Sequence, residues 1–227
     1  MRQRSGSPDR NYALDRYRDL AHRYDIATAG IDRKRRRAIE LLQLQPGQTV
    51  LDAACGTGLA LEALARLVGP RGRVIGVEQS PEMIAIAHQR CAALGLQNVI
   101  LLEAPVEDAR IPGPLDALLF SFAHDVLQSP AALANAFAAT HPGARVASAG
   151  AKLYPRWLFF LDFWVRWRVR NYVSTLEGLE RPWRLLEKYV PDFTVAETTY
   201  FGSAYLGSGN YPGAIPARAS IAAPQCA

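Results

Sequence analysis

The sequence predicts an α/β protein whose mostly parallel sheet carries helices on both faces. Between residues 49 and 149, short apolar segments alternate with segments of helical spacing, the pattern of repeated β–α units. Residues 114–121 are apolar along most of their length, as in a parallel strand that is covered on both faces. A chain of 227 residues with 49% hydrophobic content is long enough to bury a sizeable core in one domain.

The first β–α unit contains a glycine turn. Residues 49–51 predict a buried strand, Gly56 and Gly58 a turn, and residues 59–68 a helix. Glycine accepts positive φ and lets a ligand approach the backbone, while the helix behind it offers free N–H groups. A second strand, 72–77, leads to Glu78, about twenty residues on, the spacing at which an acidic side chain binds ribose hydroxyls. The pair predicts a nucleotide-like cofactor.

The other elements follow from periodicity and punctuation. Residues 11–27 carry apolar and aromatic residues at helical spacing and predict one or two short helices; an amphipathic helix follows, whose basic run, 33–37, is expected to face outward. Ser80 and Pro81 predict the start of a helix that stops at Gly95. The predicted helices are 31–44, 80–94 and 130–140, the further strands are 98–102, 114–121 and 145–149, and 121–127 is a loop at the carboxyl end of a strand.

Composition changes after residue 153. Residues 154–190 hold all four tryptophans and six of the arginines; helical spacing predicts that most of these aromatic residues seal the core, with a last helix at 182–190. Residues 193–200 and 203–206 predict two paired strands. We therefore expect disorder at 1–10, a single domain at 11–207 with a helical cap (11–45) and a helical lid (154–190), and a flexible tail at 208–227.

Four motifs in order, 50–58, 74–83, 115–120 and 141–146, resemble those of class I S-adenosylmethionine-dependent methyltransferases, over residues 46–152. The resemblance implies a Rossmann-like sheet of seven strands that ends in an antiparallel hairpin, with S-adenosylmethionine as the cofactor. Nicotinamide-binding proteins usually have a third glycine in the turn, where this chain has Leu61. Because a diphosphate requires more close backbone approach than a sulfonium nucleoside, this difference favours S-adenosylmethionine.

The resemblance also implies site residues. Where the family often sets an aspartate against the adenine, this chain has Ala104, so either a neighbour such as Glu107 or the backbone takes that role. The expected cofactor-binding residues are Asp52, Ala54, Cys55, Gly56, Gly58, Glu78, Gln79, Met83, Pro105, Val106, Glu107, Ser121 and Phe122. The expected substrate-binding residues are Tyr12, Tyr17, Tyr24, Tyr154, Trp157, Asn171 and Tyr172, for each of which a packing role is the alternative.

Catalysis requires little from the protein, because a sulfonium carbon is already a strong electrophile. His124, in the loop after the fourth strand, is the predicted general base, and Asp125 is expected to orient it or to bind an amine. The remaining histidines, His22, His88 and His141, lack metal-ligand spacing, so no metal is expected.

Two reactions remain open. One is methylation of an N, O or C atom of a small molecule, such as a secondary metabolite or a lipid headgroup. The other is attack of the cofactor's own α-amine on its γ-carbon, which gives azetidine-2-carboxylate and methylthioadenosine. A cofactor sensor without turnover is a third class. Nucleic-acid methylation is not expected, because the Asn-Pro-Pro-Tyr type of motif is absent after the fourth strand.

Bulk properties limit the setting. The net charge of +5 arises from the first 37 residues, which hold eleven Lys and Arg against five Asp; this is either a solvated helix face or a patch for nucleic acid, anionic lipid or an acidic carrier. The apolar run 157–165 is too short and too charged to span a bilayer, and no signal peptide is expected. Three unevenly spaced cysteines predict no disulfide framework and a cytoplasmic location. The oligomeric state stays open.

Overall fold

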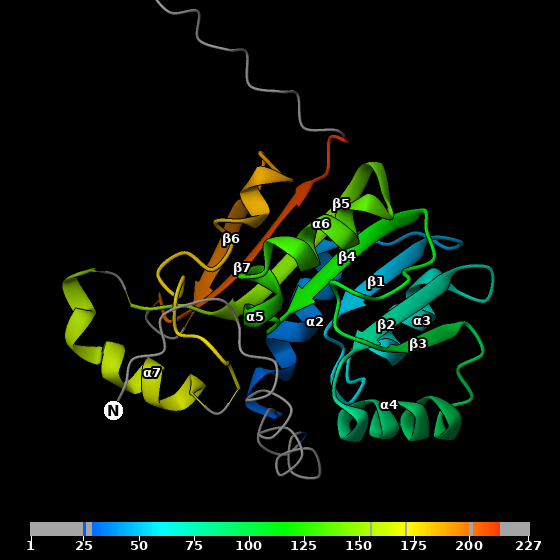
Figure 1. Cartoon of the computed structure of the whole chain (residues 1–227), viewed down its shortest axis with the longest axis horizontal. Helices are drawn as coiled ribbons and strands as arrows, with labels where there is room; N and C mark the ends of the chain where they lie inside the picture. The colour runs from blue at the N-terminus through cyan, green and yellow to red at the C-terminus, as the bar shows by residue number, and fades with distance from the viewer. Residues whose placement is uncertain (1–24, 26–28, 155, 171, 200–201, 214–227) are drawn as a thin grey trace, which may run out of the picture.

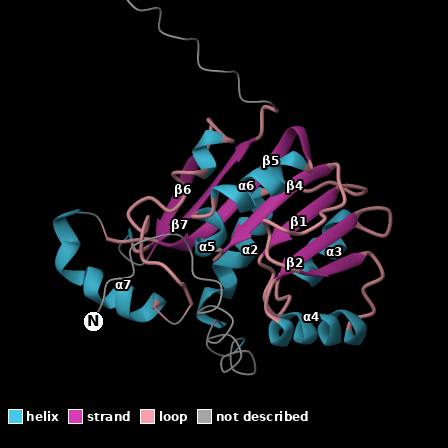
Figure 2. Cartoon of the chain, viewed as in Figure 1, coloured by secondary structure: helices cyan, strands magenta, loops and turns pink. Residues whose placement is uncertain are grey.

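The computed structural model describes residues 25, 29–154, 156–170, 172–199 and 202–213. Its centre is a seven-stranded sheet in the order β3-β2-β1-β4-β5-β7-β6, with helices on both faces (Figures 1 and 2). β1 to β5 pair in parallel, and β7 is antiparallel to both β5 and β6. The predicted fold class, including the C-terminal antiparallel hairpin, is confirmed.

The strands are β1 (Thr49–Ala53), β2 (Arg73–Glu78), β3 (Val99–Glu103), β4 (Leu115–Ser121), β5 (Thr140–Ala151), β6 (Thr194–Thr199) and β7 (Ala204–Asn210). The helices are η1 (Ala29–Ile31), α2 (Asp32–Leu41), α3 (Leu61–Val68), α4 (Pro81–Ala93), α5 (His124–Leu127), α6 (Pro130–Ala138), η2 (Arg156–Leu161), α7 (Asp162–Val169) and η3 (Leu186–Lys188).

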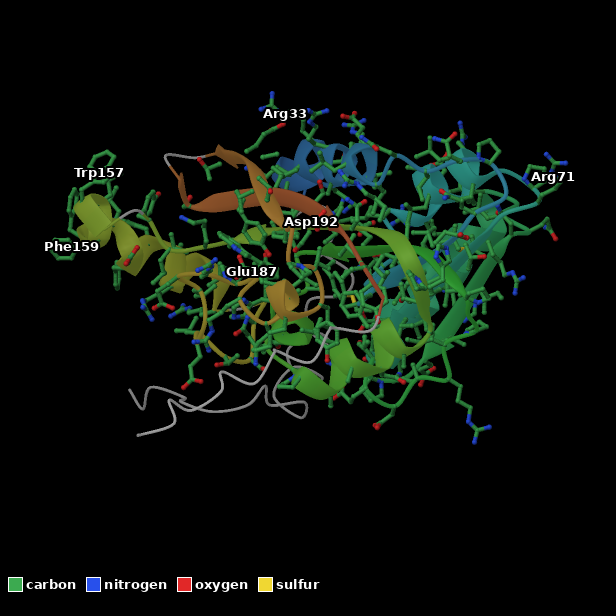
Figure 3. The ribbon with its side chains drawn as sticks, turned by 90° about the horizontal axis from the view of Figure 1, so that it is seen from above. Arg33, Arg71, Trp157, Phe159, Glu187 and Asp192 are labelled. Atoms are coloured by element: carbon green, nitrogen blue, oxygen red, sulfur yellow. The ribbon has the colours of Figure 1, made fainter. Side chains whose placement is uncertain are left out.

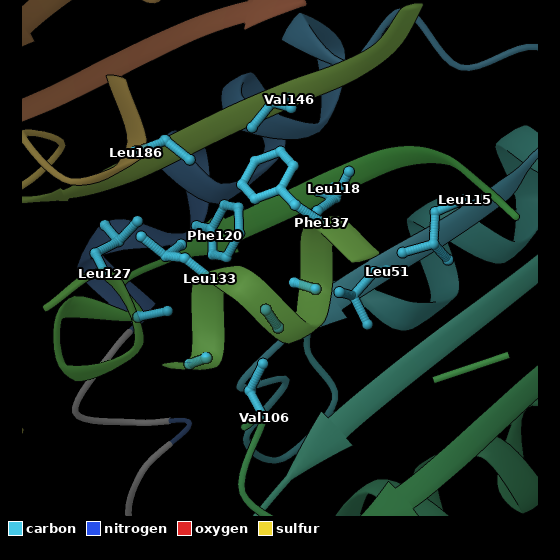
Figure 4. Packing of buried hydrophobic residues seen from close by; sticks show 14 of the residues in the cluster. Leu51, Val106, Leu115, Leu118, Phe120, Leu127, Leu133, Phe137, Val146 and Leu186 are labelled. Atoms are coloured by element: carbon cyan, nitrogen blue, oxygen red, sulfur yellow. The ribbon is translucent and has the colours of Figure 1, made fainter. Parts of the chain in front are cut away.

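One face of the sheet is covered by α5, α6 and the turns around η3. Alternate strand residues such as Leu51 and Phe120 point to this side, where they meet Leu133 and Phe137 of α6 (Figure 4). The ring of Phe137 stacks on that of Tyr189, with centroids 4.5 Å apart. Because strand side chains alternate between faces, this layer takes Leu51 and Ala53 from β1 and Leu118 and Phe120 from β4.

The opposite face carries α2, α3 and α4. Val50 and Leu119, the sequence neighbours of Leu51 and Phe120, point to this side and pack against Leu42 and Leu61. β1 and β4 therefore bury both of their faces, which explains why their sequences are apolar without alternation.

Helix starts follow the predicted chemistry. Ser80 Oγ accepts the backbone N–H of Met83 at 3.3 Å at the start of α4, and Ser129 Oγ accepts the N–H of Ala132 at 3.2 Å at the start of α6. In both helices proline occupies the first turn, where its missing N–H costs nothing. The N-cap prediction for Ser80 is confirmed.

β5 and β7 are longer than predicted. β5 begins at Thr140 instead of residue 145, because a register shift between Leu115 and Ala117 of β4 accommodates the proline and glycine that predict a turn. β7 continues to Asn210, so the paired strand extends past residue 208, where the predicted tail begins. Here tertiary pairing overrides a glycine-rich local sequence.

Three predictions about helices and loops are wrong in detail. The basic run of α2 does not all face outward, since Lys34 and Arg35 are buried on the same side as Ala38 and Ile39; positions three and four apart share a helix face. The predicted helix at 182–190 is instead a series of turns with only the short η3. The predicted loop at 121–127 also contains the single-turn helix α5.

The prediction that most aromatic residues of 154–190 seal the core is also wrong. Trp183 is partly buried, and its ring centroid lies 4.6 Å from that of Tyr205. The aromatic residues of η2 and α7 instead face solvent. α7 attaches through Val165 and Val169, which pack with Leu153 and Leu179, so aliphatic residues rather than tryptophans anchor the helix.

Candidate active site

A well-formed cavity of the described part of the chain, hereafter the main cavity, lies at the carboxyl ends of the central parallel strands. Its volume is about 340 Å³, and the residues that follow β1, β2, β3 and β4 line it. The strand order reverses between β1 and β4, and ligands of open α/β sheets bind at such a switch point. The topology therefore brings the predicted cofactor residues to one edge of the sheet.

Ten of the thirteen predicted cofactor-binding residues line the main cavity: Ala54, Gly56, Glu78, Gln79, Met83, Pro105, Val106, Glu107, Ser121 and Phe122. Asp52 and Cys55 lie behind the turn in a smaller cavity of about 20 Å³. Gly58 lines neither cavity. A Cβ on Gly58 would lie 2.7 Å from Leu61 Cδ1 and 3.2 Å from Ala87 Cβ, so this glycine allows α3 and α4 to pack closely.

The backbone at the cavity is strained at two positions. Ala54 and Phe122 have φ values of 60° and 57°, in the left-handed region that residues with a Cβ rarely adopt. Gly56, with φ 58°, adopts the same region without that cost. Strained non-glycine residues concentrate at functional sites, where the surrounding structure holds them, and both of these residues line the main cavity.

Glu78 is fixed by the glycine turn. Its Oε2 accepts the N–H of Gly56 at 3.0 Å, and its Oε1 accepts the N–H of Ser80 at 2.8 Å. The residue is only 6% exposed, and burial raises the pKa of its carboxyl, while the two backbone hydrogen bonds oppose that rise. Glu78 is thus an oriented acceptor at the cavity wall with lone pairs left for a ligand.

The carboxyl group of Asp52 and the guanidinium of Arg35 lie behind the glycine turn. Burial raises the pKa of Asp52 to about 7; the positive charge of Arg35 opposes the rise and the negative charge of Glu78 adds to it. Arg35 and Asp52 line the same small cavity. The charge of Arg35 predicts a place on the solvent face, although its spacing of three and four residues from Ala38 and Ile39 is a signal for the buried face.

Asp25 ties the segment before α2 to the glycine turn. Thr57 Oγ1 donates to Asp25 Oδ1 at 2.6 Å, and the Arg90 guanidinium donates to Asp25 Oδ2 and, at 2.9 Å, to the carbonyl of Thr57. Three segments distant in the sequence therefore meet at one ion pair. None of these three residues stands out as a site residue from the sequence.

His124, the predicted general base, lines the main cavity and is 8% exposed. Its Nε2 lies 2.9 Å from the carbonyl oxygen of Glu177. A carbonyl only accepts, so Nε2 carries the hydrogen and Nδ1 of the neutral ring carries the lone pair. Burial lowers the pKa of His124, although the negative charge of Asp125 opposes this. The ring is therefore held in a neutral, proton-accepting form near neutral pH.

Asp125 lines the cavity beside His124. Both of its carboxylate oxygens accept the backbone N–H of Ser174, at 3.1 and 2.9 Å. Burial raises the pKa of Asp125, and the hydrogen bonds from Ser174 oppose the rise. Asp125 thereby holds the segment after α7 against α5.

Two buried polar atoms at the cavity have no hydrogen-bond partner within the described structure: Ser121 Oγ and His124 Nδ1. A buried polar atom without a partner costs on the order of 1–3 kcal/mol. Because Ser121 and His124 both line the main cavity, a bound ligand is a reasonable source for the missing hydrogen bonds.

The predicted substrate residues are only partly brought together. Tyr172 lines the main cavity, as does Ser174, which was not among the predicted site residues. Tyr154 lies outside the cavity lining, and Trp157 is a surface residue, 73% exposed. Tyr12, Tyr17, Tyr24 and Asn171 lie outside the described residues.

The described residues contain no cluster of three or more potential metal ligands. They also contain no helix of the length and apolar content needed to cross a membrane.

The sequence matches the family model of a methyltransferase domain over residues 50–143. It is 34% identical over 104 residues to the demethylmenaquinone methyltransferase of Bacillus cytotoxicus, and the match covers 41% of this chain and 44% of that protein. The chain thus aligns with less than half the length of the curated relatives it matches.

Two solved structures share the fold. A SAM-dependent methyltransferase from Aquifex aeolicus is 20% identical, with a TM-score of 0.53 over 78% of this chain and 88% of that one. The [4+2]-cyclase SpnF is 14% identical, with a TM-score of 0.69 over 94% of this chain and all of that one. Together the domain match and these similarities lead to one conclusion: residues 50–143 match a methyltransferase domain, and the described chain has the Rossmann-like fold of S-adenosylmethionine-dependent methyltransferases.

Proposed function

We propose that this protein transfers the methyl group of S-adenosylmethionine to an N, O or C atom of a small molecule in the main cavity. The observation that carries the proposal is the Glu78 carboxylate. Backbone N–H groups of Gly56 and Ser80 hold it in place, and it still lines the main cavity. A fixed anionic acceptor beside a glycine turn is suited to the hydroxyls of a ribose.

The other lining residues fit the rest of such a cofactor. Val77, Met83 and Val106 supply apolar surface for an adenine ring, and Gln79 and Glu107 supply polar groups at the same wall. S-adenosylmethionine brings a sulfonium-bound methyl group that is already electrophilic. The protein has to hold the acceptor in line and to take up a proton where the acceptor carries one.

His124 is the proposed proton acceptor. The carbonyl of Glu177 fixes the hydrogen on Nε2, and burial keeps the ring neutral, so Nδ1 is ready to accept. In this proposal Asp125 acts as a positioning residue, because it binds the N–H of Ser174 and thereby holds the segment that carries Tyr172 at the cavity.

The relatives support a small-molecule acceptor. The curated match is named for demethylmenaquinone, a small molecule, but it covers less than half of either chain. We therefore propose a class of acceptor, a small molecule, and no individual compound.

The alternative reaction is closure of the cofactor's own amino acid part to azetidine-2-carboxylate, with release of methylthioadenosine. The observation that favours it is size. The main cavity, about 340 Å³, lies at the lower end of the roughly 300–1,000 Å³ typical of ligand pockets, which leaves little room for a large acceptor beside the cofactor.

One experiment tests both reactions. The purified protein is incubated with S-adenosylmethionine, alone and with a panel of small acceptors including quinols and phenols, and products are followed by mass spectrometry. S-adenosylhomocysteine with a methylated acceptor supports the proposal, whereas methylthioadenosine without acceptor supports the alternative. Calorimetric titration with S-adenosylhomocysteine accompanies it, and failure to bind would refute the cofactor assignment itself.

A further inference from the structure

Six large aromatic side chains of η2 and α7 are exposed to solvent, each between 51% and 73%. We call this set the aromatic patch; its members are Trp157, Phe159, Phe160, Phe163, Trp164 and Trp167. Elsewhere in the described chain only Leu67 and Leu94 are comparably exposed large apolar residues. A concentration of this kind within eleven residues of sequence marks an interaction surface.

The patch is continuous along α7 and separate from the face that anchors the helix. The rings of Phe163 and Trp164 pack edge to face with their centroids 5.9 Å apart. The rings of Trp164 and Trp167 do the same with centroids 6.2 Å apart. The anchoring residues Val165 and Val169 are buried against the body. α7 thus has two apolar sides, and the protein itself covers only one.

The aromatic patch lies at one end of the molecule. In Figure 1, α7 stands beyond the hairpin edge of the sheet, away from α3 and α4. In Figure 3, Trp157 and Phe159 project outward at the end opposite Arg71. Among the described residues, the patch is therefore open at this end to a flat surface.

The segment that bears the patch is strongly basic. Residues 156–170 contain four arginines and a single acidic residue, Asp162, whose carboxylate accepts the N–H of Tyr154 at 2.9 Å. The Arg170 guanidinium lies over the Trp167 ring, 5.7 Å from its centroid. Aromatic residues interleaved with cations are the composition of helices that lie in the headgroup region of anionic bilayers.

We propose that the aromatic patch docks on the surface of an anionic phospholipid bilayer. Tryptophan and phenylalanine enter the boundary of headgroups and acyl chains. Arg170 meets lipid phosphates, and Arg166 does so by exchanging its 3.9 Å ion pair with Glu180 for a phosphate. Charge argues against a second copy as the occupant, because two patches face to face would oppose two net-positive segments.

Docking at this position would also determine how the acceptor reaches the main cavity. This part of the inference rests on the proposed function. Tyr172 and Ser174 follow α7 directly and line the main cavity, so the cavity wall continues into the docked segment. A bilayer-dissolved acceptor with a polar ring and an apolar tail would then reach the cavity without crossing water.

Vesicle flotation tests the docking separately from catalysis. The full-length protein is mixed with vesicles of phosphatidylcholine containing about one quarter phosphatidylglycerol, or of phosphatidylcholine alone. We expect flotation with the anionic vesicles and a blue shift of tryptophan emission. The triple variant Phe163→Ser, Trp164→Ser, Trp167→Ser should lower partitioning at least about tenfold, whereas Leu67→Ser with Leu94→Ser, the matched control, should leave it unchanged.

The charge contribution has its own variant. Arg166→Gln with Arg170→Gln should remove the preference for anionic over neutral vesicles. Unchanged thermal melting and unchanged S-adenosylhomocysteine binding would show that each variant is folded.

Two outcomes overturn the proposal. One is absence of flotation with the anionic vesicles, whatever the catalytic result. The other is concentration-dependent dimerisation that the triple aromatic variant abolishes, which would assign the patch to a second copy. Loss of methyl transfer with intact flotation would instead refute the proposed function and leave the docking standing.

Discussion

Replacing Glu78 by glutamine tests the cofactor site most directly. The carboxylate accepts two backbone N–H groups, from Gly56 at 3.0 Å and Ser80 at 2.8 Å. Glutamine retains one acceptor oxygen and presents an NH₂ group to the other N–H. Hydrogen bonds to a charged acceptor contribute about 1.5–3 kcal/mol each, so the turn loses one such bond and any ribose hydroxyl loses its charged partner.

The effects on folding and on binding differ in size. Burial raises the pKa of Glu78, so the neutral glutamine avoids a desolvation cost that offsets part of the lost hydrogen bond. We therefore expect the free energy of unfolding to change by no more than about 1 kcal/mol. The cofactor gains no such compensation, and a loss of about 2 kcal/mol raises its dissociation constant roughly 30-fold.

Isothermal titration calorimetry with S-adenosylhomocysteine is the assay. Glu103→Gln is the matched control, because Glu103 pairs in register with Glu78 at the end of the neighbouring strand but is exposed and lines neither cavity. An unchanged dissociation constant for folded Glu78→Gln, or an equal weakening by Glu103→Gln, would refute the ribose role of Glu78.

Three further variants extend the test. Gly58→Ala should destabilise the protein by about 1–3 kcal/mol in chemical denaturation, because its Cβ would meet Leu61 and its φ is +79°. Asp52 has a pKa of about 7 when folded against an ordinary 3.8, so its full contribution to stability is present only below the lower value and is lost as pH rises through about 7. Asp52→Asn should therefore flatten the fall in stability between about pH 4 and 7. His124→Asn should lower kcat by about 10²-fold or more and remove the acidic limb of the pH–rate profile, which should lie below pH 6.5 because the pKa of His124 is lowered.

Each of these variants has a control or a contrary outcome. Gly47→Ala shares a positive φ, +94°, but has open space around the new Cβ, so equal destabilisation would show that packing against α3 is not the cause. A parallel pH dependence for wild type and Asp52→Asn would place the titration elsewhere. His88→Gln, at an exposed position, should retain full activity, and an unaltered profile for His124→Asn would exclude it as the base.

The sheet could be predicted because local and tertiary signals agree there. The apolar segments around Leu51 and Phe120, the cap at Ser80 and the turn at Gly56 each favour the element that forms. Clustering of the cofactor residues then follows from topology alone, since the carboxyl ends of parallel strands meet at one edge.

The predictions that were wrong concern helices on which packing decides which of two faces is buried. Arg35 carries a charge that predicts solvent exposure, yet Asp32, at 2.9 Å, and the nearby Asp52 offset its burial. The aromatic residues of α7 predict a core, but Val165 and Val169 already fill the available contact with the body. Hydrophobicity alone does not tell which apolar side of a helix finds a partner.

The position of β7 has a consequence for synthesis. β5 pairs along its outer side with β7, a strand that lies more than fifty residues later in the chain and itself carries β6. While the ribosome is still translating residues 152–203, β5 has an open edge that offers free N–H and C=O groups to other nascent chains. Slowed translation across this region should therefore increase aggregation, and a chaperone that recognises extended backbone would act at this stage.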